Sequence, residues 1–338
     1  MMALRPTLRL HPMSASMLLV VARGLESCAS KAFYHAPAAG TTGASYAQAS
    51  WAPEGFQNYS LVAKRSAGRN SSLLTFALPA GMPTLGAQVI SGVKVRRTLA
   101  GEALDKSYSP SSHAEAEGTF DLLVKSYEPV KGGGLGHFLC AMEPGDEVEM
   151  KVKGAKKING APLGRRQYAR IGMLAGGTGV APFMNLVATL LADAEDETLL
   201  DLVVSHSEAE DAMLRGELED LAVQSGGRLR VHHTFSRASG DAAAPAAARG
   251  GGGGDDGGPF FSEGVGRIDA ALAAAMLPSA DADDVLVLVC GTDGFVDSMA
   301  GAITRVRDPV TNVKSKVQGP TTGVLGGLGF APHQVFKL

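Results

Sequence analysis

Cysteine is scarce in this sequence, and the cysteines present are not spaced for cross-linking or metal binding. The 338 residues include three, Cys28, Cys140 and Cys290, which are odd in number and far apart. Such a set supports neither a disulfide framework nor a zinc site. We therefore expect no metal centre, and either a reducing compartment or cysteines held apart.

A strong charge of one sign is also missing. Lys and Arg number 31 against 34 for Asp and Glu, which gives a formal net charge of −3. This balance gives no indication of a polyanion-binding surface. We expect no nucleic acid partner.

The N-terminal region lacks an apolar run long enough to cross a membrane. Its apolar stretch, Met17–Ala22, is far too short to span a bilayer. Whether this stretch tethers the mature protein to a membrane stays open, so peripheral membrane association is one expectation.

Acidic residues are absent from the start of the chain. None precedes Glu26, whereas Arg5, Arg9 and Arg23 occur among Ser, Ala and Leu. This is the composition of an organellar transit peptide, and arginine on both sides of the short apolar core argues against the alternative, a secretory signal. We expect residues 1–50 to be a disordered or cleaved transit peptide for the mitochondrion, with a plastid or membrane-associated cytoplasmic location as alternatives.

Short apolar or alternating runs, each ended by Gly, Pro or Asn, fill the segment 51–165. Several short strands separated by turn signals indicate an antiparallel barrel or sandwich. A short helix is expected at 136–142. The expected strands are 59–65, 73–78, 89–95, 119–127 and 147–152.

Strand and helix patterns alternate in the segment 166–338, which indicates a doubly wound parallel sheet. Within it, residues 238–259 consist mainly of Ala, Gly and Asp and have little apolar bulk to offset their ordering entropy, so we expect a disordered insertion. The expected strands are 170–174, 199–204, 229–234 and 285–289, and the expected helices are 184–192, 210–223, 268–276 and 296–303.

The most informative stretch is 171–183, where an apolar run ends in three glycines and an apolar helical pattern follows. It has neither a P-loop ending nor G-x-G-x-x-G spacing. At a strand–turn–helix junction, backbone N–H groups can approach a ligand and the helix N-terminus favours an anion, so a nucleotide pyrophosphate fits. The alternative is a bare turn that needs glycine only for its geometry.

Four motifs together resemble the ferredoxin-NADP reductase superfamily, and most closely the NADH-cytochrome b5 reductase family. The stretch Lys106–Ser112 is similar to the family's FAD-binding segment R-x-Y-[S/T]-x-x-S, with lysine in place of arginine. By resemblance, Lys106 contacts the flavin phosphates, Tyr108 packs on the isoalloxazine, the Ser109 hydroxyl reaches flavin N5, and Ser112 completes the motif. Lysine keeps the charge but loses the bidentate fork. An ordinary polar strand and turn is the alternative.

The second motif, 132–139, resembles the family's G-G-x-x-S-x-x-L, where a helix N-terminus receives the FAD pyrophosphate. Gly136 stands where the serine is expected, so that a hydroxyl contact is lost. Lys125 resembles the family lysine near the nicotinamide nucleotide, although a solvated strand lysine is the alternative. The resemblance assigns cofactor binding here to Gly133, Gly134, Leu135 and Gly136, and to Leu123 and Lys125 in the preceding strand.

The third motif is the glycine turn, which is similar to G-G-T-G-I-T-P. The matching residues, assigned by resemblance to the nicotinamide nucleotide, are Gly176, Gly177, Thr178, Gly179 and Pro182.

The fourth motif, Cys290–Phe295, resembles the family's C-G-P-P-x-M. An apolar strand delivers Cys290 to its C-terminal end, where ligands bind in open α/β sheets. By resemblance the thiol aligns hydride transfer, and Gly291 and Phe295 bind the cofactor; a buried structural cysteine is the alternative. Thr292 and Asp293 replace two prolines, which predicts a less rigid, more acidic loop.

The end of the third strand of the parallel sheet decides how the adenosine ribose is bound, since an acid favours NAD and arginine favours the 2′-phosphate of NADP. Ser236 falls where NADH-using relatives have an acid, and Arg237 follows it. The family resemblance favours NADH, while Ser236 and Arg237 permit NADPH.

The resemblance implies a six-stranded antiparallel FAD-binding barrel followed by an NAD(P)H-binding domain in one monomeric flavoprotein oxidoreductase. It implies hydride transfer from NADH to FAD and electron transfer to cytochrome b5 or a similar haem protein, with Ser109, Thr178 and Cys290 at the reacting atoms. One alternative is an NADPH-dependent reductase of ferredoxin, flavodoxin or quinone. Another is a non-catalytic nucleotide-binding protein in which the departures from the motifs mark decay.

Overall fold

The structure is a computed structural model that describes residues 55–87, 89–99, 102–127, 134–237, 260–307 and 314–338. The expectations for residues 1–50 and 238–259 lie outside the described residues. Within the described residues, no helix is long and apolar enough to cross a membrane.

The first half of the described chain forms a six-stranded antiparallel sheet in the order β4-β3-β6-β1-β2-β5. An isolated bridge between Pro110, just after β4, and Leu122 of β5 joins the two edge strands, so the sheet closes into a barrel. The elements are β1 (Gln57–Ser66), β2 (Ser71–Ala77), β3 (Gly92–Leu99), β4 (Glu102–Tyr108), β5 (Thr119–Lys125), α2 (Leu135–Ala141) and β6 (Glu147–Lys153).

Alternation of apolar and polar residues places the barrel core. In β6, Val148, Met150 and Val152 are buried while the residues between them are exposed, as a half-buried strand requires. The ring of Phe120 lies edge-on to Tyr59 at 5.5 Å and stacks near Phe76 at 5.7 Å between centroids. Aromatic pairs of this kind add to the apolar burial that stabilises the barrel.

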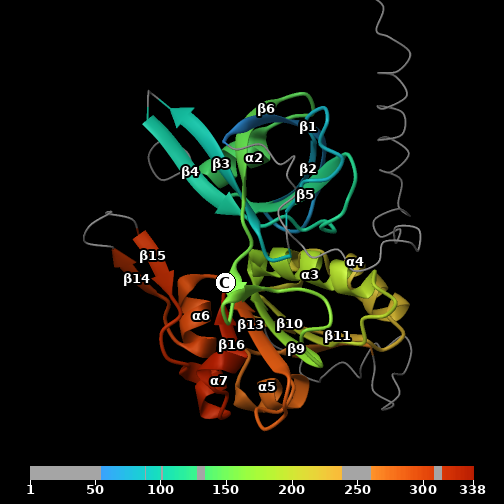
Figure 1. The fold of residues 1–338 in the computed structure, drawn as a ribbon, viewed down its shortest axis with the longest axis vertical. Coiled ribbons are helices and arrows are strands. Elements are labelled where there is room, and N and C mark those ends of the chain that lie inside the picture. Colours follow the sequence, from blue (N-terminus) through green and yellow to red (C-terminus); the bar gives the residue numbers. More distant parts are fainter. Residues whose placement is uncertain (1–54, 88, 100–101, 128–133, 238–259, 308–313) are drawn as a thin grey trace, which may run out of the picture. The chain divides into compact units, whose positions relative to one another are not determined.

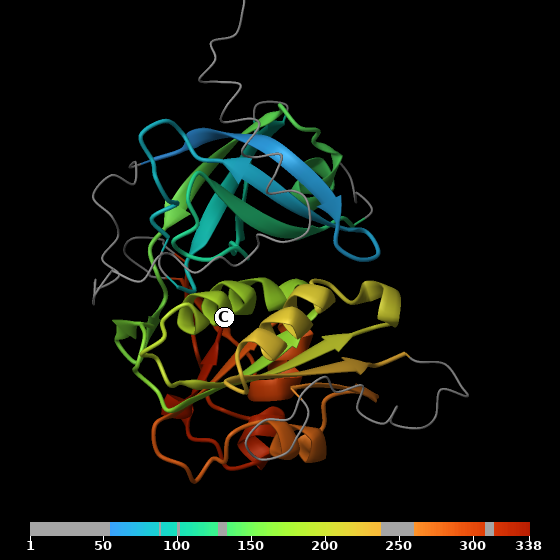
Figure 2. The ribbon, with the colours of Figure 1, turned by 90° about the vertical axis from the view of Figure 1, so that its right-hand side faces the viewer.

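The second half forms a six-stranded parallel sheet in the order β12-β11-β10-β9-β13-β16. Helices α3 and α4 cover one face, and α5, α6 and α7 pack on the other (Figures 1 and 2). Its strands are β9 (Arg170–Gly176), β10 (Leu199–His206), β11 (Leu229–Phe235), β12 (Phe261–Val265), β13 (Val285–Cys290) and β16 (Val335–Lys337). Its helices are η1 (Gly177–Val180), α3 (Ala181–Leu191), η2 (Ala209–Asp211), α4 (Arg215–Gln224), α5 (Ala270–Met276), α6 (Asp293–Ala300), α7 (Gly323–Gly327) and η3 (Pro332–Gln334).

These two sheets confirm the predicted fold class. The observed strand boundaries differ from the predicted ones where a buried segment does not have strand geometry. Val89 and Ile90 are buried, but they lie in a turn before β3, and Ile90 has a left-handed φ of 55°. An apolar run therefore indicated burial there and not a strand.

Strands that expose most of their residues, or that are very short, had no strand pattern in the sequence. All but the last residue of β4 are exposed, β12 is half-buried, and β16 has three residues. Two short antiparallel pairs were also not expected, namely β7 (Lys157–Ile158) with β8 (Ala161–Pro162), and β14 (Thr304–Arg307) with β15 (Lys314–Val317).

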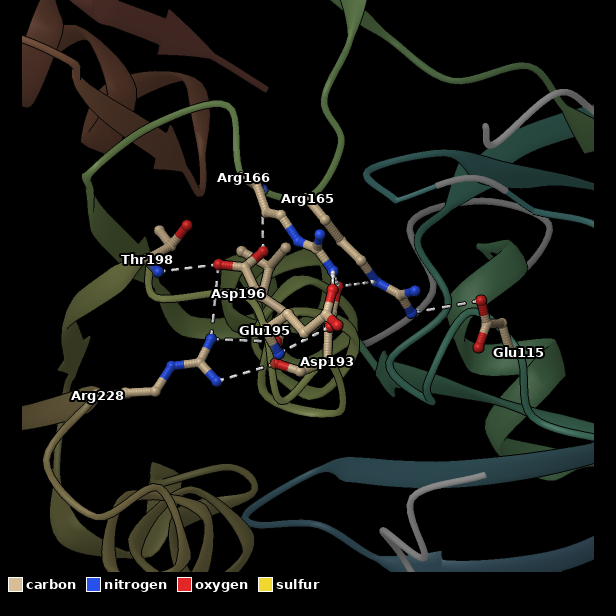
Figure 3. Close-up of polar contacts among 9 residues, drawn as sticks. Glu115, Arg165, Arg166, Asp193, Glu195, Asp196, Thr198 and Arg228 are labelled. Carbon is tan, nitrogen blue, oxygen red and sulfur yellow. Dashed lines mark hydrogen bonds and ion pairs between the residues drawn. The ribbon is translucent and has the colours of Figure 1, made fainter. Parts of the chain in front are cut away.

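The connection between the two sheets is held by a network of arginines and aspartates (Figure 3). Asp196 is buried, and its carboxylate accepts hydrogen bonds from the backbone N–H of Arg166 at 3.0 Å and of Thr198 at 2.8 Å. The Arg228 guanidinium lies 3.6 Å from the same carboxylate and donates to the carbonyl of Leu190 at the end of α3. Asp196 and Arg228 together thus join the connection, the end of α3 and the start of β11.

The same network reaches the barrel. Arg166 donates two hydrogen bonds to Asp193, at 2.9 and 3.1 Å, and Arg165 lies 3.8 Å from that carboxylate. The Arg165 guanidinium also donates to Glu115, in the loop before β5, at 3.4 Å (Figure 3). Both Arg166 bonds start at one guanidinium nitrogen, Nη2, so the contact is charge-assisted but is not a bidentate pair.

Candidate functional site

The site begins where β4 ends, with two side chains that share one strand face. The Lys106 ammonium lies 5.6 Å from the centroid of the Tyr108 ring. The Tyr108 hydroxyl is buried, and no described residue supplies it with a hydrogen-bond partner. Burial therefore raises the Tyr108 pKa far above its usual value, which keeps the hydroxyl protonated and able to donate. Ser109, the next residue, is half-buried.

Ser112 makes its hydrogen bonds to other residues of the protein. Its hydroxyl accepts a hydrogen bond from the Asp121 N–H at 3.1 Å, and its carbonyl accepts one from the Asn185 side chain of α3 at 2.6 Å. The Ala114 N–H donates to Thr189 in the same helix. This segment therefore joins the barrel to the parallel-sheet domain, a task the sequence motif did not reveal.

The start of α2 approaches the Lys125 backbone at the end of β5 closely enough to require glycine. A Cβ on Gly136 would lie 2.7 Å from the Lys125 carbonyl oxygen and 3.8 Å from the Tyr108 hydroxyl oxygen. Gly134 precedes the helix and offers no side-chain cap to its first N–H groups, and Leu135 is buried in the barrel. Gly133 lies outside the described residues.

These features fit FAD, the cofactor that the resemblance implies. A buried hydroxyl without a partner needs an acceptor, because an unsatisfied buried polar group costs about 1–3 kcal/mol. Uncapped N–H groups beside it suit an anionic oxygen. The Lys106 ammonium, 5.6 Å from the centroid of the Tyr108 ring, supplies positive charge nearby.

Two other residues predicted to bind cofactors lie in β5. Lys125 forms an ion pair of 3.5 Å with Asp211 of η2, which links the barrel to the parallel-sheet domain. Leu123 is buried and alternates with the core residues Leu122 and Val124, so it lies on the other face of the strand.

The glycine turn and the cysteine motif meet backbone to backbone. A Cβ on Gly179 would lie 2.2 Å from the Cys290 carbonyl oxygen and 2.9 Å from the Gly291 nitrogen. Gly177 has a left-handed φ of 55°, Thr178 is half-buried between the two glycines, and Pro182 lies in the first turn of α3. The turn needs glycine both for its conformation and for this approach.

Phe295 packs beneath the same junction. A Cβ on Gly176 would lie 2.8 Å from its ring, and one on Gly291 would lie 2.7 Å from it. The ring also belongs to the core of α5, α6 and α7. Phe295 therefore supports the two glycines from the core side.

Specific contacts hold the loop in which Thr292 and Asp293 replace two prolines. The Thr292 hydroxyl caps α6 by accepting from the Phe295 N–H at 3.3 Å. The Asp293 carboxylate accepts two hydrogen bonds from Arg305, at 3.0 and 3.2 Å. A helix cap and an exposed ion pair are thus the contacts of this segment, and its lower rigidity stays a prediction.

A thiol from one domain and an amine from the other lie close together at this end of β13. Burial raises the Cys290 pKa to about 11, an effect that the nearby Lys156 and Lys316 ammonium groups oppose. Burial lowers the Lys156 pKa to about 8, and Cys290 opposes this shift while Lys316 and Lys153 add to it. The thiol is therefore neutral at pH 7. Cys140 and Cys290 are both free thiols.

No sequence motif identified Lys156 as a site residue. It follows β6 in an ordinary basic pair, and only the fold leaves it half-buried and in electrostatic interaction with Cys290. Among the described residues, no group of three or more His, Cys, Asp or Glu could hold a metal ion.

Ser236 and Arg237 follow β11 at the same sheet edge as the glycine turn and Cys290. Their backbone N–H groups donate to the carbonyls of His206 and Ser207, each at 2.9 Å. Ser236 is half-buried and Arg237 is exposed. The fold thus places the predicted nicotinamide nucleotide residues together, while their contacts to a cofactor stay predictions.

Two family models match the chain. The model described as oxidoreductase FAD-binding domain matches residues 58–157, and the oxidoreductase NAD-binding domain matches residues 173–246. NADH-cytochrome b5 reductase 1 of Aspergillus terreus is 30% identical over 278 residues, covering 78% of this chain and 84% of that protein. The protein of the same name from Mycosarcoma maydis is 28% identical over 254 residues, covering 74% and 68%.

Solved structures share the fold. The cytochrome b5 reductase domain of Ulva prolifera nitrate reductase aligns with a TM-score of 0.58 at 24% identity, over 72% of this chain and 89% of that one. The CS-b5R domains of human Ncb5or in the NAD+ form align with a TM-score of 0.58 at 20% identity, over 83% and 69%. The two family models and the similarity to the curated relatives, of which one is 30% identical, show that the chain is an FAD-dependent oxidoreductase that belongs to the NADH-cytochrome b5 reductase family.

Proposed function

We propose that this protein transfers hydride from NADH to FAD and then single electrons to cytochrome b5 or a similar haem protein. The observation that supports it most directly is the backbone contact between Gly179 and Cys290, since it joins the two nucleotide motifs at the carboxyl edge of the sheet. Ligands bind at this edge in open α/β sheets.

When bound, FAD supplies the chemistry that accepts a hydride and releases electrons singly, so the chain's own residues bind and orient. In this proposal Tyr108 donates its buried hydroxyl and presents its ring, while Lys106 contributes charge toward the phosphates. Ser109 supplies a hydroxyl beside them. Backbone N–H groups of the turn at Gly177–Gly179 and the Thr178 side chain hold the nicotinamide nucleotide.

Cys290 acts in this proposal as an uncharged contact. Because burial raises its pKa to about 11, the thiol keeps its proton at pH 7. A neutral sulfur can pack against an uncharged ring without the cost of a buried thiolate. We therefore assign Cys290 to alignment of the reacting atoms and not to proton transfer.

NADH is our proposed electron donor, in keeping with the relatives' printed names. NADPH is the specific alternative, because Ser236 and Arg237 offer a hydroxyl and a guanidinium and no carboxylate of their own. An NADPH-dependent reductase of ferredoxin, flavodoxin or quinone would follow from that preference. We further propose a mitochondrial monomer with peripheral membrane association, on the basis of the N-terminal composition and the short apolar stretch.

The visible spectrum of the purified full-length protein tests the proposal, with NADH and then NADPH added under anaerobic conditions. We expect flavin absorption that bleaches faster with NADH. Faster bleaching with NADPH would make NADPH the preferred electron donor and would assign Ser236 and Arg237 as ligands of its 2′-phosphate. A colourless protein that takes up no added FAD would support a non-catalytic nucleotide-binding protein instead.

A further inference from the structure

A row of three polar side chains lies along one face of the β3–β4 strand pair. Residues directly opposite each other in register share a face, and side chains alternate along each strand. The register pairs are Val93 with Tyr108, Val95 with Lys106, and Arg97 with Leu104. Tyr108, Lys106 and Arg97 therefore share a face and follow one another in that order.

The Arg97 guanidinium contacts an aromatic ring and no acid. Its Cζ atom lies 4.3 Å from the centroid of the Phe138 ring in α2, and the residue is half-buried. Glu102 of β4 shares its face, yet no carboxylate of the described residues forms an ion pair with Arg97. Five N–H donors are thus held against α2 with no acceptor in the described part of the chain.

Arg96, the preceding residue, is bound in the opposite way. Its side chain lies on the other face of β3, where Nε and Nη2 donate to the two carboxylate oxygens of Asp105 at 2.9 and 3.1 Å. Lys94, on the same face as Arg96, lies 3.5 Å from that carboxylate. Asp105 therefore neutralises the cations of the other face, and this fully bonded guanidinium is a matched comparison for Arg97.

The other two members of the row also have polar groups that the described residues do not bond. The Tyr108 hydroxyl is buried without a hydrogen-bond partner. Lys106 is exposed, and its ammonium lies 5.6 Å from the centroid of the Tyr108 ring. At about 3.4 Å per residue, the ring, the ammonium and the guanidinium follow one another along about 14 Å of strand.

Helix α2 contacts both ends of the row. A Cβ on Gly136 would lie 3.8 Å from the Tyr108 hydroxyl oxygen, and Phe138, two residues later, carries the ring that Arg97 contacts. Positions two residues apart are about 200° apart around an α-helix, and aromatic side chains lean toward the helix N-terminus. The first turn of α2 thus has the Tyr108 hydroxyl on one side and the Arg97 guanidinium on another.

The row suits an elongated ligand with a ring at one end and two anionic groups beyond it. Tyr108 offers a ring and a hydroxyl donor, Lys106 a point charge, and Arg97 a planar fork of donors. A phosphate is an anion that matches this fork. FAD has its groups in the same order, with the isoalloxazine followed by one phosphate and then by a second phosphate that leads to adenosine.

We propose that Arg97 binds the phosphate on the adenosine side of FAD and thereby makes the site select FAD over FMN. Lys106 binds the phosphate that both flavins have. The inference rests on the proposed function for its cofactor. FMN ends at its single phosphate, so it leaves the Arg97 guanidinium without an anion and gains nothing from it.

Binding of FAD, FMN and riboflavin to the full-length protein, followed by flavin fluorescence after removal of bound flavin, tests the proposal without any turnover. Arg97→Met keeps an apolar side chain against the Phe138 ring and removes the charge and the donors. We expect it to weaken FAD binding about 5–20-fold and to change FMN and riboflavin binding by less than about twofold. Lys106→Met should weaken FAD and FMN alike, by about 3–10-fold, and leave riboflavin within about twofold.

Arg96→Met is the matched control, because this neighbouring guanidinium lies on the other face and is bonded to Asp105. Its affinities for all three flavins should stay within about twofold of the wild-type values. Arg97→Lys keeps the charge and loses the fork, so its loss of FAD affinity should be smaller than that of Arg97→Met. Thermal unfolding of the flavin-free variants checks folding, and the midpoint of Arg97→Met should lie within about 2 °C of the wild-type midpoint.

The pattern across the three flavins decides the result. Unchanged FAD affinity in Arg97→Met, or equal losses for FAD and FMN, would overturn the proposal, as would a wild-type protein that binds FMN as tightly as FAD. Selective FAD binding that depends on Arg97, without bleaching by NADH, would refute the proposed function and support this inference. A protein that binds no flavin would refute both.

Discussion

Gly179 and Cys290, which are far apart in the sequence, are in backbone contact where the glycine turn meets the end of β13. A Cβ on Gly179 would lie 2.2 Å from the Cys290 carbonyl oxygen, so no other residue fits without movement of one backbone. Packing alone therefore requires glycine at position 179, whether or not this residue also binds a ligand.

Replacement of Gly179 by alanine tests this contact. We expect a loss of at least about 1–3 kcal/mol in the free energy of unfolding and weaker NADH binding, because the turn and the Cys290 loop must separate. Urea unfolding and NADH titration measure the two effects. Gly216→Ala in α4 has open space around its Cβ and should not destabilise the protein. Equal stability of the two variants would contradict the interpretation.

Gly136→Ser restores the residue that the family motif has at this position, yet we expect it to harm this protein. A Cβ there would lie 2.7 Å from the Lys125 carbonyl oxygen, so α2 and β5 must move apart. The expected cost is about 1–3 kcal/mol in stability, together with faster loss of FAD. The control is Gly134→Ser, which has open space and an N-cap position that serine favours. Higher FAD affinity in Gly136→Ser would show that the family contact can be rebuilt.

Tyr108→Phe separates the hydroxyl from the ring. Without FAD the variant should be as stable as the wild-type protein or up to about 1 kcal/mol more stable, because it removes a buried hydroxyl that no described residue bonds. FAD affinity should fall about 5–10-fold, and Tyr108→Ala should lower it further by removing the ring. Flavin fluorescence during titration measures both. Unchanged FAD affinity in Tyr108→Phe would exclude the hydroxyl as a ligand.

A buried histidine pair makes the protein sensitive to acid. His206 and His233 are both buried, and their ring nitrogens lie 3.2 Å apart. Burial lowers the pKa of His206 to about 4 and that of His233 to about 3, and the His206 ring adds to the latter shift. Between these values and the unfolded pKa of about 6.5, the unfolded chain binds more protons than the folded one.

Stability should therefore be complete above about pH 6.5 and should fall as the pH drops toward about 4, by up to about 1.4 kcal/mol per pH unit for each histidine. Urea unfolding across this range measures the slope. His233→Gln should reduce the slope, whereas His137→Gln, at an exposed position on α2, should not. The same slope in His233→Gln would assign the acid sensitivity to other groups.

Asp196 is the residue on which the connection between the domains depends. Asp196→Ala leaves two backbone N–H groups and part of the Arg228 guanidinium without their acceptor, which should cost about 2–4 kcal/mol in the free energy of unfolding. Glu195→Ala removes an exposed partner of Arg166 and should change stability by less than about 1 kcal/mol. Similar losses in both variants would mean that the network acts through its surface charges.

The sequence alone determined the fold class and the position of the motifs. The glycine turn with its flanking apolar runs predicted β9 and α3, and the run at 147–152 predicted the strand β6, because both patterns report local geometry and burial. The family motifs located Tyr108 and Cys290 by residue type and spacing, without any statement of their surroundings.

The tertiary structure decided which of these residues meet and what holds them. The partners of Ser112, the burial of Lys156 near Cys290 and the close approach of Gly136 to Lys125 each depend on segments that are distant in the chain. The backbone contact between Gly179 and Cys290 is the clearest case, since the two residues are far apart in the sequence. A pattern along the chain reports local geometry and burial, whereas the order of the strands in the sheet selects which distant residues lie together.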